Sequence, residues 1–241
     1  MNACRAVLVL SVIAAALLLV AGPGTRLDWW DFRQGFALMR WAAYAGLAAA
    51  VLALAMLLVP RMRRRGGAAL VVALLLGLGV AWVPWNGMRQ ARQVPPIHDI
   101  STDTRRPPQF VATLPLRADA PNLAGYGGAE VAKAQAEAYP DLQTRQMGLP
   151  PAQAFERALA TARDMDWEIV AADPASNRIE ATATTLWFGF KDDVVVRVEA
   201  DPSAPDGDGS RVDVRSVSRV GKSDVGTNAK RIRAYLEMLG N

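Results

Sequence analysis

Three long stretches without a charged side chain constrain this chain more than any other feature of its 241 residues. They cover residues 6–25, 41–60 and 66–88, and are therefore 20, 20 and 23 residues long. A helix rises about 1.5 Å per residue and the hydrocarbon core of a bilayer is about 30 Å thick, so about 20 residues suffice to cross it. The stretches are rich in Leu, Ala and Val and lack the alternation of a barrel strand. We therefore predict three transmembrane helices within residues 1–88.

The first stretch has an alternative interpretation, as a cleavable signal peptide with Arg5 in its basic region. However, no A-x-A cleavage site follows its apolar run, which ends in Ala21-Gly22-Pro23-Gly24. We therefore expect this span to be retained, and we expect the lipid bilayer to be a partner of the chain.

Charge in the two connecting segments predicts the orientation. Residues 60–66 contain four arginines and no acid, whereas residues 25–35 contain two arginines balanced by two aspartates. Arginine-rich connections stay on the cytoplasmic side of a membrane. The amino terminus is then cytoplasmic and everything after about residue 88 is exported. In a bacterium, this predicts a multi-pass inner-membrane protein with a periplasmic carboxy-terminal part.

The overall charge of +4 does not indicate nucleic-acid binding. Residues 1–90 carry 9 basic and 2 acidic side chains, so the remaining 18 and 21 leave residues 91–241 with a net charge of −3. The basic excess thus lies among the apolar stretches. One cysteine, Cys4, excludes a disulfide framework, and one histidine, His98, argues against zinc. We expect no nucleic-acid partner, no metal and no cofactor.

The exported part divides into two regions. Residues 89–150 are rich in proline, and we expect them to form a linker or an extended segment that lies against the domain following it. Residues 151–241 show one helical period, then period-two alternation, then a second helical period. The expected elements are a helix at 152–165, strands at 167–171, 178–185, 193–200 and 211–220, and a helix at 224–239. This order predicts an α+β domain, an antiparallel four-stranded sheet with two helices packed on one face.

Two polar regions of this domain are candidates for ligand binding. Residues 211–233 hold seven basic side chains and two acids around a turn into the last helix, and a helix amino terminus beside arginines suits an anion. Residues 186–193 combine three aromatic side chains with two carboxylates. The candidate ligand-binding residues are Trp187, Phe188, Asp192, Asp193, Arg197, Arg215, Arg219, Ser223, Asp224, Asn228 and Arg231.

The same residues have a purely structural interpretation. In it, Ser223 or Asp224 caps the last helix, the arginines pair with Asp192, Asp193 or Glu199, and the aromatic side chains belong to the core. No nucleophile elbow and no nucleotide-binding motif is present, so we assign no catalytic residue.

We therefore expect a non-enzymatic membrane-anchored domain that binds another envelope protein or an anionic small molecule. The alternative is an uncharacterised hydrolase that activates water with Asp192, Asp193 or His98. Adjacent residues of a strand point to opposite faces, which makes the two aspartates a poor acid–base pair.

Three segments of the exported part also carry a family resemblance. PPIHDISTDTRRPPQF at 95–110, RIEATATTLWFGFKDDVVVRV at 178–198 and SRVDVRSVSRVGKSDVGTNAKRIR at 210–233 resemble the domain of unknown function 1499 family. The resemblance implies a bacterial membrane protein in which such a domain follows hydrophobic spans. It implies no reaction, cofactor or catalytic residue.

Overall fold

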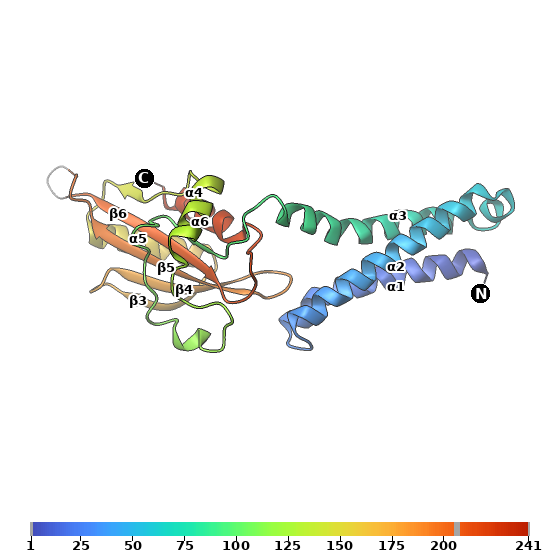
Figure 1. Ribbon diagram of the computed structural model, residues 1–241, viewed down its shortest axis with the longest axis horizontal. Coiled ribbons are helices and arrows are strands. Elements are labelled where there is room, and N and C mark those ends of the chain that lie inside the picture. Colours follow the sequence, from blue (N-terminus) through green and yellow to red (C-terminus); the bar gives the residue numbers. More distant parts are fainter. Residues whose placement is uncertain (1, 205–207, 241) are drawn as a thin grey trace. The chain divides into compact units, whose positions relative to one another are not determined.

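A computed structural model of the chain describes residues 2–204 and 208–240, which form two compact units (Figure 1). One unit contains the residues up to Gln90 together with Leu186–Gly189. The other contains Ala91–Thr185 and the residues from Phe190 onwards. We call them the helical unit and the sheet unit.

The helical unit consists of α1 (Ala3–Arg26), α2 (Phe32–Leu58) and α3 (Pro60–Ala91). All three helices are long and apolar enough to cross a membrane. The arginine-rich stretch 60–66 is not a separate loop, as the sequence analysis assumed, but forms the first turns of α3. Proline at the first helical position already has helical backbone geometry, so α3 begins directly at Pro60, and Gly66 then interrupts its regular helical geometry.

Small residues bring α2 and α3 close together. A Cβ atom added to Gly77 would lie 2.3 Å from the carbonyl oxygen of Gly46, so only glycine fits at this crossing. The neighbouring alanines, Ala49 and Ala53 on α2 and Ala73 on α3, are fully buried. Crossings of this kind are typical of helices that associate in lipid, where close packing replaces the hydrophobic effect.

The described residues of the sheet unit form six strands, and every pair of neighbours is antiparallel. The strands are β1 (Asp99–Ser101), β2 (Arg145–Met147), β3 (Glu168–Asp173), β4 (Arg178–Thr184), β5 (Lys191–Ala200) and β6 (Ser210–Ser218). They follow the order β1-β6-β5-β4-β3, and β2 also pairs with β6. The helices are α4 (Gly128–Ala138), α5 (Pro151–Asp164) and α6 (Thr227–Leu239), with a 3-10 turn, η1, at Pro115–Arg117.

The α+β class is confirmed, but the prediction of four strands is wrong. The two additional strands, β1 and β2, come from the proline-rich region and both pair with β6, Ile100 opposite Ser216 and Gln146 opposite Arg211. Each is only three residues long, which is too short for period-two alternation to stand out in the sequence.

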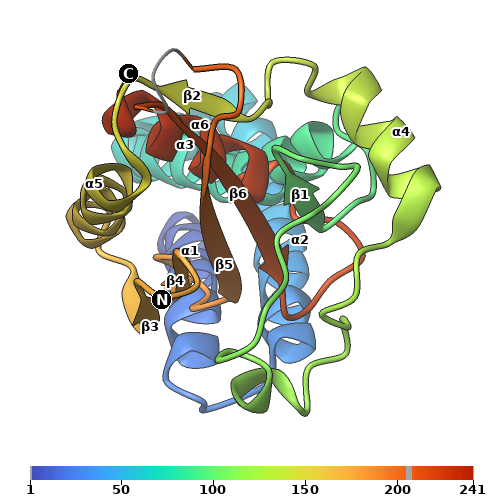
Figure 2. The ribbon, with the colours of Figure 1, turned by 90° about the vertical axis from the view of Figure 1, so that its left-hand side faces the viewer.

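Alternation along β4, β5 and β6 sorts their side chains onto two faces. One face packs against α5 and α6, which Figure 2 shows on the same side of the sheet. Its buried residues include Ile179, Ala181, Val194, Val196, Val212 and Val214 from the strands, and Phe155, Ile232 and Tyr235 from the helices. The opposite face, which carries the charged residues of the alternation, is covered by the proline-rich region.

Candidate functional site

The second face of the sheet carries charged residues that are buried. Glu180 on β4, Asp193 on β5, and Asp213 and Arg215 on β6 are all at most 3% exposed. Isolated buried charges are costly, so each needs a partner. Several of these partners come from residues 99–126, which lie on the domain as a covering segment.

Arg215 is the most enclosed of these charges. Its Nε and Nη2 atoms donate to the two carboxylate oxygens of Asp99 at 2.9 and 2.8 Å. Its remaining hydrogen bonds go to the carbonyl oxygens of Pro108 and Ala124 at 3.0 and 2.7 Å. The guanidinium group therefore joins β6 to three points of the covering segment.

Asp193 is held by two arginines. Arg219 donates to both of its oxygens at 3.0 and 2.7 Å, and the buried Arg117 lies 3.3 Å from it. The hydroxyl of Thr182 donates a further hydrogen bond at 2.9 Å. Burial lowers the pKa of Arg117, an effect that the Asp193 carboxylate opposes.

The carboxylate of Glu180 is held mainly by backbone N–H groups and not by a buried arginine. Its carboxylate accepts the N–H groups of Val111, Ala112 and Thr113 at 2.9–3.0 Å, and the hydroxyl of Thr113 at 3.0 Å. Arg178, at the rim, donates at 3.0 Å. Burial by itself raises the pKa of Glu180, but the hydrogen bonds from Ala112, Thr113 and Val111 outweigh burial and hold that pKa below its ordinary value.

A fourth group joins Arg197 to two aspartates. Its Nη2 atom donates to Asp213 at 2.8 Å and to Asp103 of the covering segment at 2.9 Å. Burial opposes the charge of Arg197, yet the hydrogen bond and the charge of Asp213 raise its pKa overall. The second face is thus a network of ion pairs that fixes residues 99–126 onto the sheet.

A smaller polar cluster lies on the helix-covered face, where β5 and β6 approach α6. Arg231 donates to Asp192 at 2.6 Å and also bonds to Asn228 and Ser216. The Asp224 carboxylate accepts the N–H groups of Gly226 and Asn228 at 2.9 and 2.7 Å, and so caps the start of α6. Burial raises the pKa of Asp224 despite these two bonds.

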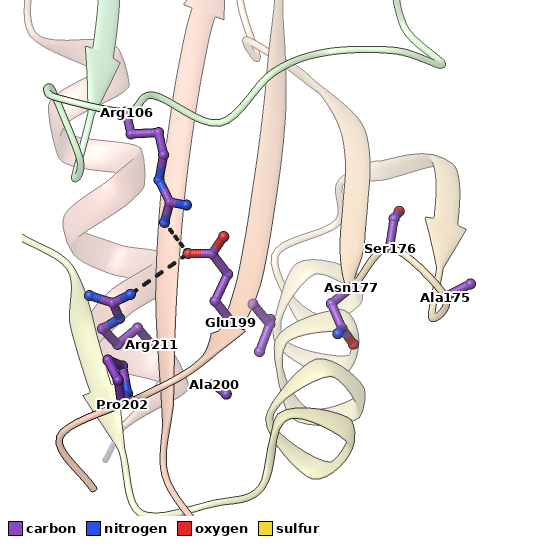
Figure 3. Close-up of a pocket in the computed structure, with 9 residues that line it drawn as sticks. Arg106, Ala175, Ser176, Asn177, Glu199, Ala200, Pro202 and Arg211 are labelled. Atoms are coloured by element: carbon purple, nitrogen blue, oxygen red, sulfur yellow. Dashed lines mark hydrogen bonds and ion pairs between the residues drawn. The ribbon is translucent and has the colours of Figure 1, made fainter. Parts of the chain in front are cut away.

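An open depression of about 500 Å³ lies where β5 and β6 meet the β3–β4 turn (Figure 3). Arg106 and Arg211 lie on either side of Glu199, with Ser176 and Asn177 across from them. Arg106 bonds to the Glu199 carboxylate and Arg211 lies 3.9 Å from it. The other lining residues are Ala175, Val198, Ala200 and Pro202. We call this the Glu199 depression.

The sequence indicated Glu199 only as a possible ion-pair partner, and the depression was not predicted. Glu199 and Arg211 are cross-strand partners, a relation that follows once β5 and β6 are paired. Arg106 belongs to the covering segment, 93 residues from Glu199, and no local pattern connects the two.

A family model described as Protein of unknown function (DUF1499) matches residues 99–239. The chain belongs to this family. The match begins at β1 and ends with α6, so the covering segment and the sheet together make up the DUF1499 domain. No curated protein and no solved structure matches the chain.

The DUF1499 domain places the predicted ligand-binding residues in separate groups. Asp193, Arg197, Arg215 and Arg219 lie on the second face. Asp192 of β5 lies on the helix-covered face with Asp224, Asn228 and Arg231, where α6 begins. Ser223 accepts the N–H of Val225 at 3.1 Å. Trp187 and Phe188 fall within the segment 186–189, which groups with the helical unit.

The three residues of the hydrolase alternative have different partners. Asp192 bonds to Arg231 and Asp193 to Arg219, on opposite faces of β5. The Nδ1 atom of His98 lies 3.5 Å from the carbonyl oxygen of Lys222. Among residues 2–204 and 208–240, no group of three His, Cys, Asp or Glu side chains is arranged to hold a metal ion.

Proposed function

We propose that this protein is anchored in the bacterial inner membrane by α1, α2 and α3 and that its DUF1499 domain is a non-enzymatic binding module in the periplasm. We further propose that the domain binds an acidic group in the Glu199 depression. The group belongs either to another envelope protein or to a small anion. Three apolar helices followed by a domain of this family support the anchoring, and four arginines between the second and third spans support the orientation.

The arrangement of Arg106 and Arg211 around Glu199 carries the binding proposal. These two arginines share the Glu199 carboxylate in the open depression, and Arg197, outside the lining, lies 3.7 Å from the same carboxylate. An incoming carboxylate or phosphate can therefore accept hydrogen bonds from both guanidinium groups, which suit such ligands because they donate in pairs. In contrast, Arg215, Arg219 and Arg231 each already hold a carboxylate, and at least 85% of each side chain is buried.

The depression also offers a neutral donor opposite the arginines. Asn177 lies in the β3–β4 turn and lines the depression across from the arginines in Figure 3, whereas the hydroxyl of the neighbouring Ser176 already donates to Asp173 at 2.6 Å. A ligand with more than one oxygen can thus be contacted from two sides. A ligand role for the residues on the second face and at the start of α6 remains a prediction.

Replacing both Arg106 and Arg211 by glutamine is expected to weaken binding of inorganic phosphate about a hundredfold, since each of the two charged hydrogen bonds contributes about 1.5 kcal/mol or more. The measurement is calorimetric titration of the full-length protein in detergent with inorganic phosphate. Arg233→Gln is the matched control, because Arg233 is also exposed and ion-paired but binds Asp141 away from the depression.

A second arm distinguishes a protein partner from a small anion. A photo-crosslinking amino acid at Ser176 in intact membranes should give a defined adduct that disappears in the double variant but not in Arg233→Gln. Equal phosphate affinity in all three proteins, together with an adduct unaffected by the double substitution, would remove the depression as a binding site.

A further inference from the structure

The covering segment exposes four aliphatic side chains within thirteen residues. Val111, Leu114, Leu116 and Leu123 are 52, 44, 53 and 79% exposed. They surround the 3-10 turn η1, which forms the green turn below the sheet in Figure 2. We call residues 110–123 the apolar loop. Single exposed aliphatic residues are ordinary, but a group of four on one short loop marks an interaction surface.

Buried contacts hold this loop in place from both ends. At its start, Phe110 is buried and the next three residues donate their N–H groups to Glu180. Towards its end, the side-chain amide of Asn122 donates to the carbonyl oxygens of Ser218 and Gly221 at 3.0 and 2.8 Å. Between them, Arg117 is buried and donates to the carbonyl oxygen of Asn122 at 3.0 Å. The aliphatic side chains are thus presented on a preorganised loop, so binding through them costs little ordering entropy.

The position of the loop in the chain keeps it near the end of an apolar helix. The third apolar helix ends at Ala91, and 18 residues separate it from Phe110. An extended chain spans at most about 3.6 Å per residue, so the loop stays within about 65 Å of the end of that helix. If the helix crosses a membrane, the chain therefore tethers the loop close to the bilayer. This tethering gives the lipid a high effective concentration for binding to the loop.

The chemistry of the loop also favours lipid over a protein partner. Its exposed apolar side chains are all aliphatic, whereas the residues that dominate protein interfaces are Trp, Tyr and Arg. Its arginine is buried, and its exposed charged residue is Asp119, which gives no attraction to anionic lipid. We propose that the apolar loop inserts Val111, Leu114, Leu116 and Leu123 into the surface of the bilayer, and that it does so in neutral lipid.

A fluorescent label at position 123 tests this insertion. The full-length Cys4→Ser, Leu123→Cys protein carries an environment-sensitive nitrobenzoxadiazole label and is reconstituted in phosphatidylcholine vesicles. We expect blue-shifted emission and at least twofold stronger quenching by spin-labelled lipid than for the same label at Glu130→Cys. Glu130 is the control because it is exposed on α4, outside the loop.

A second variant distinguishes loss of membrane insertion from misfolding of the domain. Val111→Ser, Leu114→Ser and Leu116→Ser together should return the label at position 123 to water-like emission, with unchanged near-ultraviolet circular dichroism. Water-like emission at position 123 in the parent protein would overturn the proposal, as would quenching that appears only in native membranes, which would indicate a protein partner. The inference uses only the membrane anchoring of the proposed function, and flotation of the protein with the vesicles checks that anchoring independently.

Discussion

Replacing Arg215 by methionine is expected to lower the free energy of unfolding of the DUF1499 domain by about 3–5 kcal/mol. Arg215 is fully buried and donates to both oxygens of Asp99. Methionine leaves that carboxylate buried without its cation, and it also leaves the carbonyl oxygens of Pro108 and Ala124 without their guanidinium donor. Because β1 and the covering segment are joined to β6 through this group, their attachment should be lost as well.

Urea unfolding of the full-length protein in detergent, followed by pulse proteolysis of the DUF1499 domain, measures this loss. The matched control is Arg233→Met, which breaks an ion pair with Asp141 in which the two side chains are 41 and 52% exposed. Exposed pairs contribute at most about 1 kcal/mol, so the control should keep nearly the parent midpoint. Equal midpoints for the two variants would show that the buried pair does not hold the covering segment.

Replacing Glu180 by glutamine is expected to cost about 2–3 kcal/mol at neutral pH, the size of a lost set of hydrogen bonds to a charged acceptor. The amide keeps one acceptor oxygen and turns its own donor towards the N–H groups of Val111, Ala112 and Thr113. The same method measures the loss, with the exposed Glu130→Gln as control.

The effect of Glu180→Gln should also depend on pH. The pKa of Glu180 is lower in the folded domain than its ordinary value of 4.5, because hydrogen bonds to the charged form outweigh burial. The stabilisation is therefore fully present above about pH 4.5 and is lost as the pH falls through the folded pKa. The difference in midpoint between the parent and Glu180→Gln should be constant near neutral pH and shrink in acid. A difference that grows on acidification would contradict this account.

The sequence predicts the parts of the fold that local periodicity determines. Alternation along residues 178–185 and 211–220 identifies β4 and β6, and it sorts Ile179 and Val214 onto the face that the helices cover. Length and composition alone identify the three apolar helices. In contrast, β1 and β2 are missed because pairing with β6, rather than their own three residues, makes them strands.

The candidate sites are harder to predict because their partners are distant in the sequence. Arg215 and Asp99 are 116 residues apart, and Glu180 lies 67 to 69 residues from the N–H groups that it binds. Within one strand, charged residues at every second position are typical of a face that is exposed to solvent. Only the covering segment makes them buried. We expected the proline-rich region to lie against the domain, but no pattern in residues 99–126 shows which charge of the sheet each of its residues meets.

The most direct test of the proposed function is the location of the DUF1499 domain relative to the membrane. Alkaline phosphatase, which is active only after export, and a reporter that is active only in the cytosol are fused separately after Asn241 of the full-length protein. We predict an active phosphatase fusion and an inactive cytosolic reporter, because the four arginines at 61–65 are expected to stay in the cytoplasm. An active cytosolic reporter with an inactive phosphatase would contradict the periplasmic placement and the envelope partners proposed from it.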